Sequence, residues 1–408
     1  MRKETLFRAI GQIDGDLIEE AGQKKHVKKR GWVRYAALAA SLVLLVGIAK
    51  LTPQKLTPDT AKGHSDVQPG GMQDDKMQAD ETQVEETQVA ETESQNQIEK
   101  RPVLDFTMLF DGMGFQGIMA YEMPGLGNPW NETDEIETLP VIENHSIYAV
   151  SDSRNIRIEK ERYDEMLTWA LEVATFFGME DIKPEEKREY VSISNGEIEI
   201  RVDGDMQMRI HFLNEVSFPK EYHATNSATR EETYELAEYL IGEYKELFRM
   251  KNPQIAIADG DYSFDAVRNC NEIRIYDKGD TAVETLLNYH FEYVKLGISN
   301  EGEMSYIDIT RRDKEAVLGE YEIISVEEAT KRLADGRFDT TYHESEFPGL
   351  EYVRDVELVY YMNFIDDYKP YYRFWVEVLA EKQENGLNTY VAYYVPAVET
   401  AYLEITFN

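Results

Sequence analysis

Residues 190–212 decide the fold: Tyr190-Val-Ser-Ile-Ser, Asn195-Gly196, Glu197-Ile-Glu-Ile-Arg-Val, Asp203-Gly204, then Met206-Gln-Met-Arg-Ile-His-Phe. Apolar and polar residues alternate in each of the three longer segments, which is the period of a strand with one buried face. Asn-Gly and Asp-Gly between such segments are typical of tight hairpin turns. The stretch therefore predicts a three-stranded antiparallel meander.

Helical patterns lie on both sides of this meander. In residues 162–178 the larger apolar residues recur mostly on one side of a helix, and residues 231–250 repeat that spacing. Thr229, followed three residues later by Glu232, is a capping-box start for the second helix. We expect both helices to pack their apolar sides on the sheet.

Strand patterns fill most of residues 262–408. The expected strands are 272–276, a region around 289–296, 304–310, 356–362, 372–380, 390–396 and 402–407. One short helix interrupts them, capped by Ser325, supported by Glu328 and ended by Gly336. The prediction is an α+β fold in which antiparallel sheets carry a few packed helices.

The C-terminal part resembles a known kind of module. The resemblance rests on residues 321–333, 356–361, 370–378 and 390–398, where a Ser-Val-Glu-Glu-Ala helix lies among aromatic strands. This pattern is similar to the exported YycI and PepSY-like modules. The resemblance implies a domain outside the membrane that regulates sensor kinases or proteases, and it implies no functional residue.

One apolar run stands near the N-terminus. Tyr35–Ala49 is flanked by Arg34 and Lys50, and aromatic and basic flanks extend such a run toward membrane-spanning length. We predict a transmembrane helix over 32–51, anchored by Trp32, Tyr35, Leu38, Leu42, Leu44, Leu45 and Ile48. The alternative is a cleaved signal peptide, because Gly47-Ile48-Ala49 resembles a cleavage site. The long segment before the run favours the anchor.

Charge predicts the orientation of that span. Residues 1–34 hold nine Lys or Arg and five Asp or Glu. The basic residues nearest the span should keep this side cytoplasmic, and they are Lys24, Lys25, Lys28, Lys29, Arg30 and Arg34. The expected location is the cell membrane, with one span and an extracytoplasmic body.

The basic arm also has an amphipathic pattern over residues 4–22. Its apolar stripe is formed by Leu6, Ile10, Ile13 and Leu17. The stripe either docks on a cytoplasmic or membrane signalling protein or lies on the lipid surface. Residues 3–14 and 17–21, followed by the basic cluster and the short span, resemble the start of uncharacterised clostridial single-pass membrane proteins. Some of those look like anti-sigma factors.

Composition divides the chain further. Residues 52–101 lack aromatic residues and contain Pro53, Pro58, Pro69 and a repeated Thr-Gln-Val-Glu/Ala-Glu sequence, which predicts a disordered acidic linker. The expected layout is an arm over 1–31, a span over 32–51, the linker over 52–101, an α+β subdomain over 102–260 and a β-rich subdomain over 261–408.

Charge and cysteine content exclude several functions. The net charge is −35, so the acidic body should repel phosphate backbones, and we expect no nucleic-acid binding. Cys270 is the single cysteine, which excludes an intrachain disulfide.

Candidate motifs have plainer explanations. Gly112-x-Gly-x-x-Gly117 is followed by proline and glycine rather than by a helix pattern. His343 has two nearby glutamates but lies in an expected loop. Asp203-Gly-Asp205 and Asp259-Gly-Asp261 do not continue as calcium loops and are explained as turns, with weak calcium binding as the open alternative. The aromatic residues over 360–375 favour core packing over a ligand platform.

The sequence thus predicts no catalytic residue, no cofactor-binding residue and no metal ligand. We expect a non-enzymatic, membrane-anchored protein that senses or regulates through protein–protein contact in the cell envelope. The runner-up is a surface module that binds cell-wall glycan or peptide, and an unrecognised hydrolase ranks third. A cytoplasmic docking helix distinguishes the first hypothesis from the second, which does not need one.

Overall fold

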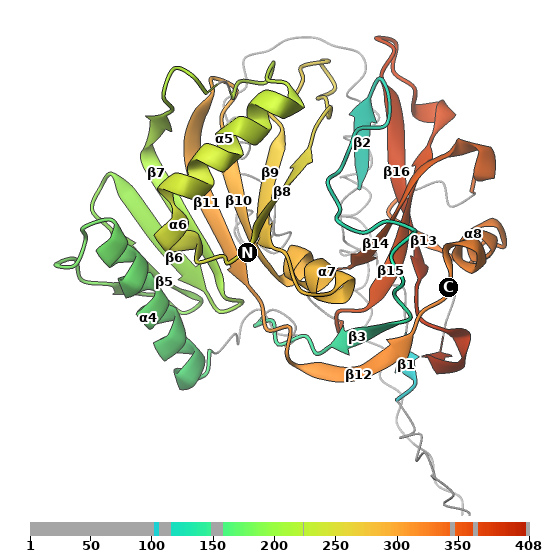
Figure 1. Ribbon diagram of the computed structural model, residues 1–408, viewed down its shortest axis with the longest axis horizontal. Coiled ribbons are helices and arrows are strands. Elements are labelled where there is room, and N and C mark those ends of the chain that lie inside the picture. The colour runs from blue at the N-terminus through green and yellow to red at the C-terminus, as the bar shows by residue number, and fades with distance from the viewer. Residues whose placement is uncertain are drawn as a thin grey trace, which may run out of the picture. The chain divides into compact units, whose positions relative to one another are not determined.

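The meander is part of a large antiparallel sheet. Among the described residues this sheet has eight strands in the order β4-β5-β6-β7-β11-β10-β9-β8 (Figure 1). The strands are β4 Glu185–Glu186, β5 Tyr190–Ser194, β6 Ile198–Asp203, β7 Gln207–Ser217, β8 Pro253–Ala258, β9 Glu272–Asp277, β10 Glu292–Ile298 and β11 Glu303–Arg311. The predicted meander is confirmed as β5–β6–β7.

The computed structural model describes residues 102–105, 116–147, 158–222, 224–342, 347–361 and 366–404. All of them belong to one compact unit, Ile98–Asn408. The expected arm, span and linker lie outside the described residues. Within the described residues, no helix has both the length and the apolar character needed to cross a membrane.

Three helices cover one face of the eight-stranded sheet (Figure 1). They are α4 Lys160–Phe176, α5 Arg230–Glu243 and α6 Lys245–Phe248. The capping box of Thr229 and Glu232 is present at α5, and Tyr244 separates the single expected helix into α5 and α6. Met166, Trp169 and Leu236 are buried against strand residues of the same face.

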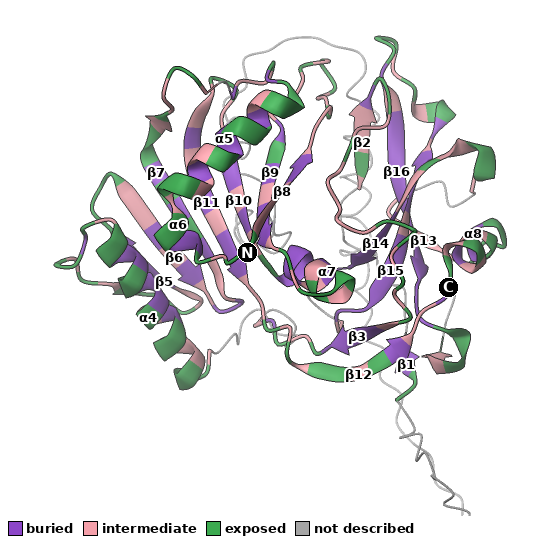
Figure 2. Ribbon diagram, viewed as in Figure 1, coloured by how far each residue is buried: buried purple, intermediate pink, exposed green. Residues whose placement is uncertain are grey.

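A second sheet of five strands forms the other half of the described region. Its order is β13-β16-β15-β14, with β2 paired to β16. The strands are β2 Gly117–Ala120, β13 Asp339–Thr340, β14 Val353–Tyr360, β15 Pro370–Glu377 and β16 Asn388–Pro396. Figure 2 shows these long strands as mostly buried. The described aromatic residues from Tyr360 to Trp375 are at most 8% exposed, so they pack in the core.

Short elements complete this half. β3 Thr138–Ile142 pairs with β12 Val317–Glu322, and β1 Leu104–Asp105 pairs in parallel with β17 Leu403–Glu404. The expected short helix is α8 Val326–Ala334, where the Ser325 side chain accepts from the Glu328 N–H. Three single-turn 3₁₀ helices lie at Leu350–Tyr352, Leu379–Glu381 and Thr400–Tyr402.

One helix of the eight-stranded half packs against the five-stranded half. α7 Ala282–Phe291 connects β9 to β10, and its Leu286 and Phe291 are buried in the core of the five-stranded half. The strand expected around 289–296 is therefore wrong in its first part, which is the end of this helix. Thr281 caps the helix by accepting from the Glu284 N–H. The aromatic residues at the end of this helix favoured a strand, so the capping signal was overlooked.

The eight-stranded sheet contains strands from before and after the boundary expected at residue 260. Strands β9–β11, after the boundary, join the meander through the pairing of β11 with β7. Overall, the described region is a mixed α and β fold with mostly antiparallel sheets and few helices.

Candidate functional site

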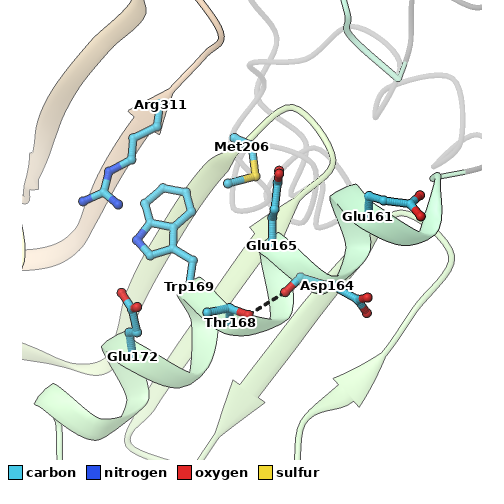
Figure 3. Close-up of a pocket in the computed structure, with 8 residues that line it drawn as sticks. All are labelled: Glu161, Asp164, Glu165, Thr168, Trp169, Glu172, Met206 and Arg311. Carbon is cyan, nitrogen blue, oxygen red and sulfur yellow. Dashed lines mark hydrogen bonds between the residues drawn. The ribbon is translucent and has the colours of Figure 1, made fainter.

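A pocket lies between α4 and the end of β11. It is an open depression of about 370 Å³. Figure 3 shows the residues that line it, which are Glu161, Asp164, Glu165, Thr168, Trp169, Glu172, Met206 and Arg311. α4 supplies six of these eight residues, so the pocket follows the helix.

The inner wall of the pocket is an aromatic ring with a cation above it. The guanidinium carbon of Arg311 lies 4.5 Å from the centre of the Trp169 ring, close enough for a cation–π interaction. The Arg311 backbone N–H donates to the Met206 carbonyl over 3.0 Å, which joins the strand end to the β6–β7 turn. Met206 has the left-handed φ of 54° there.

Two donor groups of this wall have no acceptor among the described residues. Trp169 is 5% exposed, and its indole N–H makes no hydrogen bond. The guanidinium of Arg311 likewise makes no hydrogen bond or ion pair with a described residue. Neither donor is among the fully buried polar atoms without a partner, so both can donate to water or to a ligand that enters the pocket.

Carboxyl groups line the pocket along α4. Three carboxylates follow Glu161 by three, four and eleven residues, and they are Asp164, Glu165 and Glu172. This spacing places all four on one side of the helix. Lys160 pairs with Asp164, Arg162 with Glu165 at 3.2 Å, and Arg249 with Glu172 at 3.1 Å. Glu161 has no cationic partner among the described residues.

The burial of the charged Arg311 guanidinium costs free energy. Burial, and next the charge of Arg249, lower the pKa of Arg311, while Glu292 and Glu172 act in the opposite direction. An anionic group placed beside the guanidinium would offset this cost. The pocket can therefore hold an anion at this end, although carboxylates surround the rest of it.

A second polar cluster adjoins the pocket through Met206. It surrounds the β6–β7 turn, where Asp203 Oδ1 accepts from the N–H groups of Asp205 and Gln207. Asp205 in turn accepts from Ser146 Oγ and the Ile147 N–H, at 2.8 and 2.9 Å. Asp203 thus holds the turn itself, and Asp205 ties segment 143–147 to it, beside a space of about 20 Å³.

The turn also shows why glycine is needed at 204. A Cβ added to Gly204 would lie 2.7 Å from the Ile147 side chain. Glycine at 204 therefore allows the close approach of segment 143–147. It is not needed for a left-handed backbone, because the residue of the turn with a positive φ is Met206.

Replacement of Asp203 by asparagine should stabilise the protein at pH 7. Burial, and next the charge of Asp205, raise the pKa of Asp203 from 3.8 to about 6. The folded state therefore binds the proton more tightly than the unfolded state, and Asp203 disfavours folding increasingly as pH rises from 3.8 through 6. We expect Asp203→Asn to gain about 1–2 kcal/mol at pH 7 and little at pH 4.

Urea unfolding of both proteins between pH 4 and 8 measures this difference. Asp181→Asn, at an exposed position, is the matched control and should change stability by less than about 0.5 kcal/mol. A variant that is less stable than the wild type at pH 7 would contradict the prediction.

The other face of the eight-stranded sheet is a weaker candidate. Two of its cations are paired on the sheet itself: Arg209 binds Asp308 through two bonds of 2.7 Å, and Lys295 lies 2.7 Å from Glu272. Such pairs are expected on a solvated sheet face and do not indicate a ligand.

The expected motifs lie where the sequence arguments placed them or outside the described residues. Gly117 starts strand β2 rather than a helix, while the first two glycines of that motif and residues 343–346 are not described. Asp259 pairs with Arg230, and Asp261 accepts from Met119 N–H and Asn269 Nδ2. Within the described residues, no group of three or more His, Cys, Asp or Glu side chains could hold a metal ion.

The sequence analysis missed the pocket residues. The anchor, topology and docking residues it named all precede residue 102 and lie outside the described residues. Trp169 is one of the large apolar residues of 162–178 that were expected on one side of a helix, and it is buried as expected, but its indole N–H was not considered. The carboxylates repeating beside it at helical spacing were the available signal.

Comparison with known proteins adds little. No family model and no curated protein matches this chain. Among solved structures it is similar to an uncharacterised protein from Eubacterium rectale, with a TM-score of 0.31 and 11% identity over 64% of this chain and 84% of that one.

Proposed function

We propose that this chain is a membrane-anchored extracytoplasmic sensing or regulatory protein that binds its ligand without transforming it. The pocket on α4 supports ligand binding, because the Trp169 indole N–H and the Arg311 guanidinium face it without an acceptor from the described residues.

The anchor and its orientation are part of the proposal. The apolar run 32–51 would span the membrane, and the basic cluster before it would remain cytoplasmic. The acidic tract 52–101 would then serve as a tether for the extracytoplasmic body. The stripe of Leu6, Ile10, Ile13 and Leu17 would contact the signalling partner on the cytoplasmic side.

A surface module that binds cell-wall glycan or peptide is the second candidate function. The same pocket supports it, and the charged groups that line the pocket favour a peptide over a neutral glycan. The two functions differ in their use of the cytoplasmic stripe, which a simple surface module does not need.

Three mutant strains test the proposal: a full deletion, Arg311→Gln, and Ile10→Asp with Leu17→Asp. In a growth condition where the deletion changes envelope-stress transcripts, both variants should reproduce the change while their protein remains in the membrane. If the double variant matches the wild type and Arg311→Gln does not, the chain is a surface module. If both match the wild type, the proposed function is wrong.

A further inference from the structure

We propose that the α4 pocket binds a short peptide that has a free C-terminal carboxylate and a basic residue toward its N-terminus. This inference deepens the proposed function by naming its ligand class. It rests on the chemistry at the two ends of the pocket and on the distance between them.

The carboxylate would bind at the Trp169 and Arg311 end. Figure 3 shows the guanidinium of Arg311 beside the indole ring of Trp169, with both groups at the same end of the lining helix. A carboxylate has two oxygens and can accept from a guanidinium and an indole N–H at once. The nearby Glu172 is already held by Arg249 at 3.1 Å, so its charge is compensated.

The basic residue would bind at the opposite end. Glu161 has no cationic partner among the described residues, and Asp164 and Glu165 lie one helical turn further along the same side. The partners of those two carboxylates, Lys160 and Arg162, belong to the exposed first turns of α4, where surface ion pairs exchange readily. A ligand amine can therefore compete with these weak surface ion pairs for the carboxylates.

The length of the site sets the size of the peptide. Glu161 and Trp169, at the two ends, are eight residues apart on α4, which is about 12 Å at about 1.5 Å per residue. An extended peptide covers about 3.4 Å per residue, so roughly four residues fit between the two ends. The hydroxyl of Thr168 donates to the Asp164 carbonyl over 2.7 Å, leaving the middle of the pocket without an open donor from this residue.

Calorimetry on the full-length protein in nanodiscs tests this inference with three defined peptides. The first is Lys-Ala-Ala-Ala with a free carboxylate, the second is its C-terminal amide, and the third is N-acetyl-Gln-Ala-Ala-Ala with a free carboxylate. We expect the first to bind, and the loss of the carboxylate or of the two ammonium groups to weaken binding by about tenfold or more. Equal binding of the acid and the amide, or no binding of the first peptide at millimolar concentration, would overturn the inference.

Variants assign the two ends. Arg311→Gln should abolish the difference between acid and amide, and Trp169→Phe, which keeps an aromatic ring but removes the N–H, should reduce it. Glu161→Gln should reduce the preference for lysine instead. Arg337→Gln, at an exposed position away from the pocket lining, is the matched control and should bind like the wild type. An Arg337→Gln variant that loses binding as Arg311→Gln does would contradict the assignment to this pocket.

The outcomes separate this inference from the proposed function. If the peptide binds but the Arg311→Gln strain behaves like the wild type, the ligand class stands and the sensing function fails. If that strain behaves like the deletion but the peptide does not bind, the sensing function stands and the ligand class fails.

Discussion

Replacement of Glu357 by alanine should lower the free energy of unfolding by about 3–5 kcal/mol, the cost of breaking a buried ion pair by removing one partner. Glu357 is 4% exposed. Its Oε2 accepts from Arg373 Nε, Arg373 Nη2 and Trp375 Nε1 at 2.9, 2.7 and 2.7 Å. The alanine variant would leave a guanidinium and an indole N–H without their acceptor inside the five-stranded half.

Two further variants give this prediction its control. Glu357→Gln keeps the shape and one acceptor oxygen, so it should cost less than Glu357→Ala. Glu185 pairs with Lys187 at the surface, where ion pairs contribute little, and Glu185→Ala should cost under about 1 kcal/mol. Urea unfolding followed by tyrosine and tryptophan fluorescence measures all three. Equal losses for Glu357→Ala and Glu185→Ala would show that the buried pair does not stabilise the fold.

The sequence predicted those strands and helices whose turn or capping residues lie close to them in the chain. The turn at Asn195-Gly196 has Gly196 at φ 86°, as such a hairpin requires, and Ser325 caps α8 as its sequence indicates. These features depend on residues close together in the chain. For this reason the meander and both capped helices were predictable from sequence.

Long-range pairing was not predictable in the same way. β7 pairs with β11, about a hundred residues later, and this pairing places the strands of one sheet on both sides of the expected boundary. The alternating apolar residues around Met208 and Ile307 predict a strand at each place, but they do not show which strand each one pairs with. The parallel pairing of Leu104 with Leu403 joins residues even farther apart, and two-residue strands have no detectable period.

The site was hidden for a related reason. Trp169 and Arg311 come from elements more than a hundred residues apart, and only the packing of α4 on the sheet brings them to 4.5 Å. In sequence, Trp169 has the spacing of a core residue, and its 5% exposure agrees with that interpretation. The missing acceptor for its N–H is a property of the folded protein, so no sequence pattern could reveal it.

Replacement of Phe291 by alanine should cost about 3–5 kcal/mol, because it removes a buried aromatic side chain that joins the two sheets. Phe291 ends α7, between strands β9 and β10 of the eight-stranded sheet, yet its ring is fully buried in the core of the five-stranded half. It contacts Tyr360 and Tyr368 edge to face, with ring centres 5.3 and 5.4 Å apart. The substitution would leave a cavity at this junction and remove both ring pairs.

The position of α7 makes this prediction specific to the coupling of the two halves. The preceding His290 is also buried, and α7 contacts β14 at the edge of the five-stranded sheet. Phe291→Leu should lose less stability than Phe291→Ala, because leucine fills most of the cavity. Phe264→Ala, at a side chain 66% exposed, should change stability by under about 0.5 kcal/mol.

Urea unfolding measures the loss of stability, and hydrogen exchange shows which strands it affects. Faster exchange in β14 as well as in β9 and β10 is the expected result. Exchange that rises in one half alone would mean that α7 does not couple the two sheets.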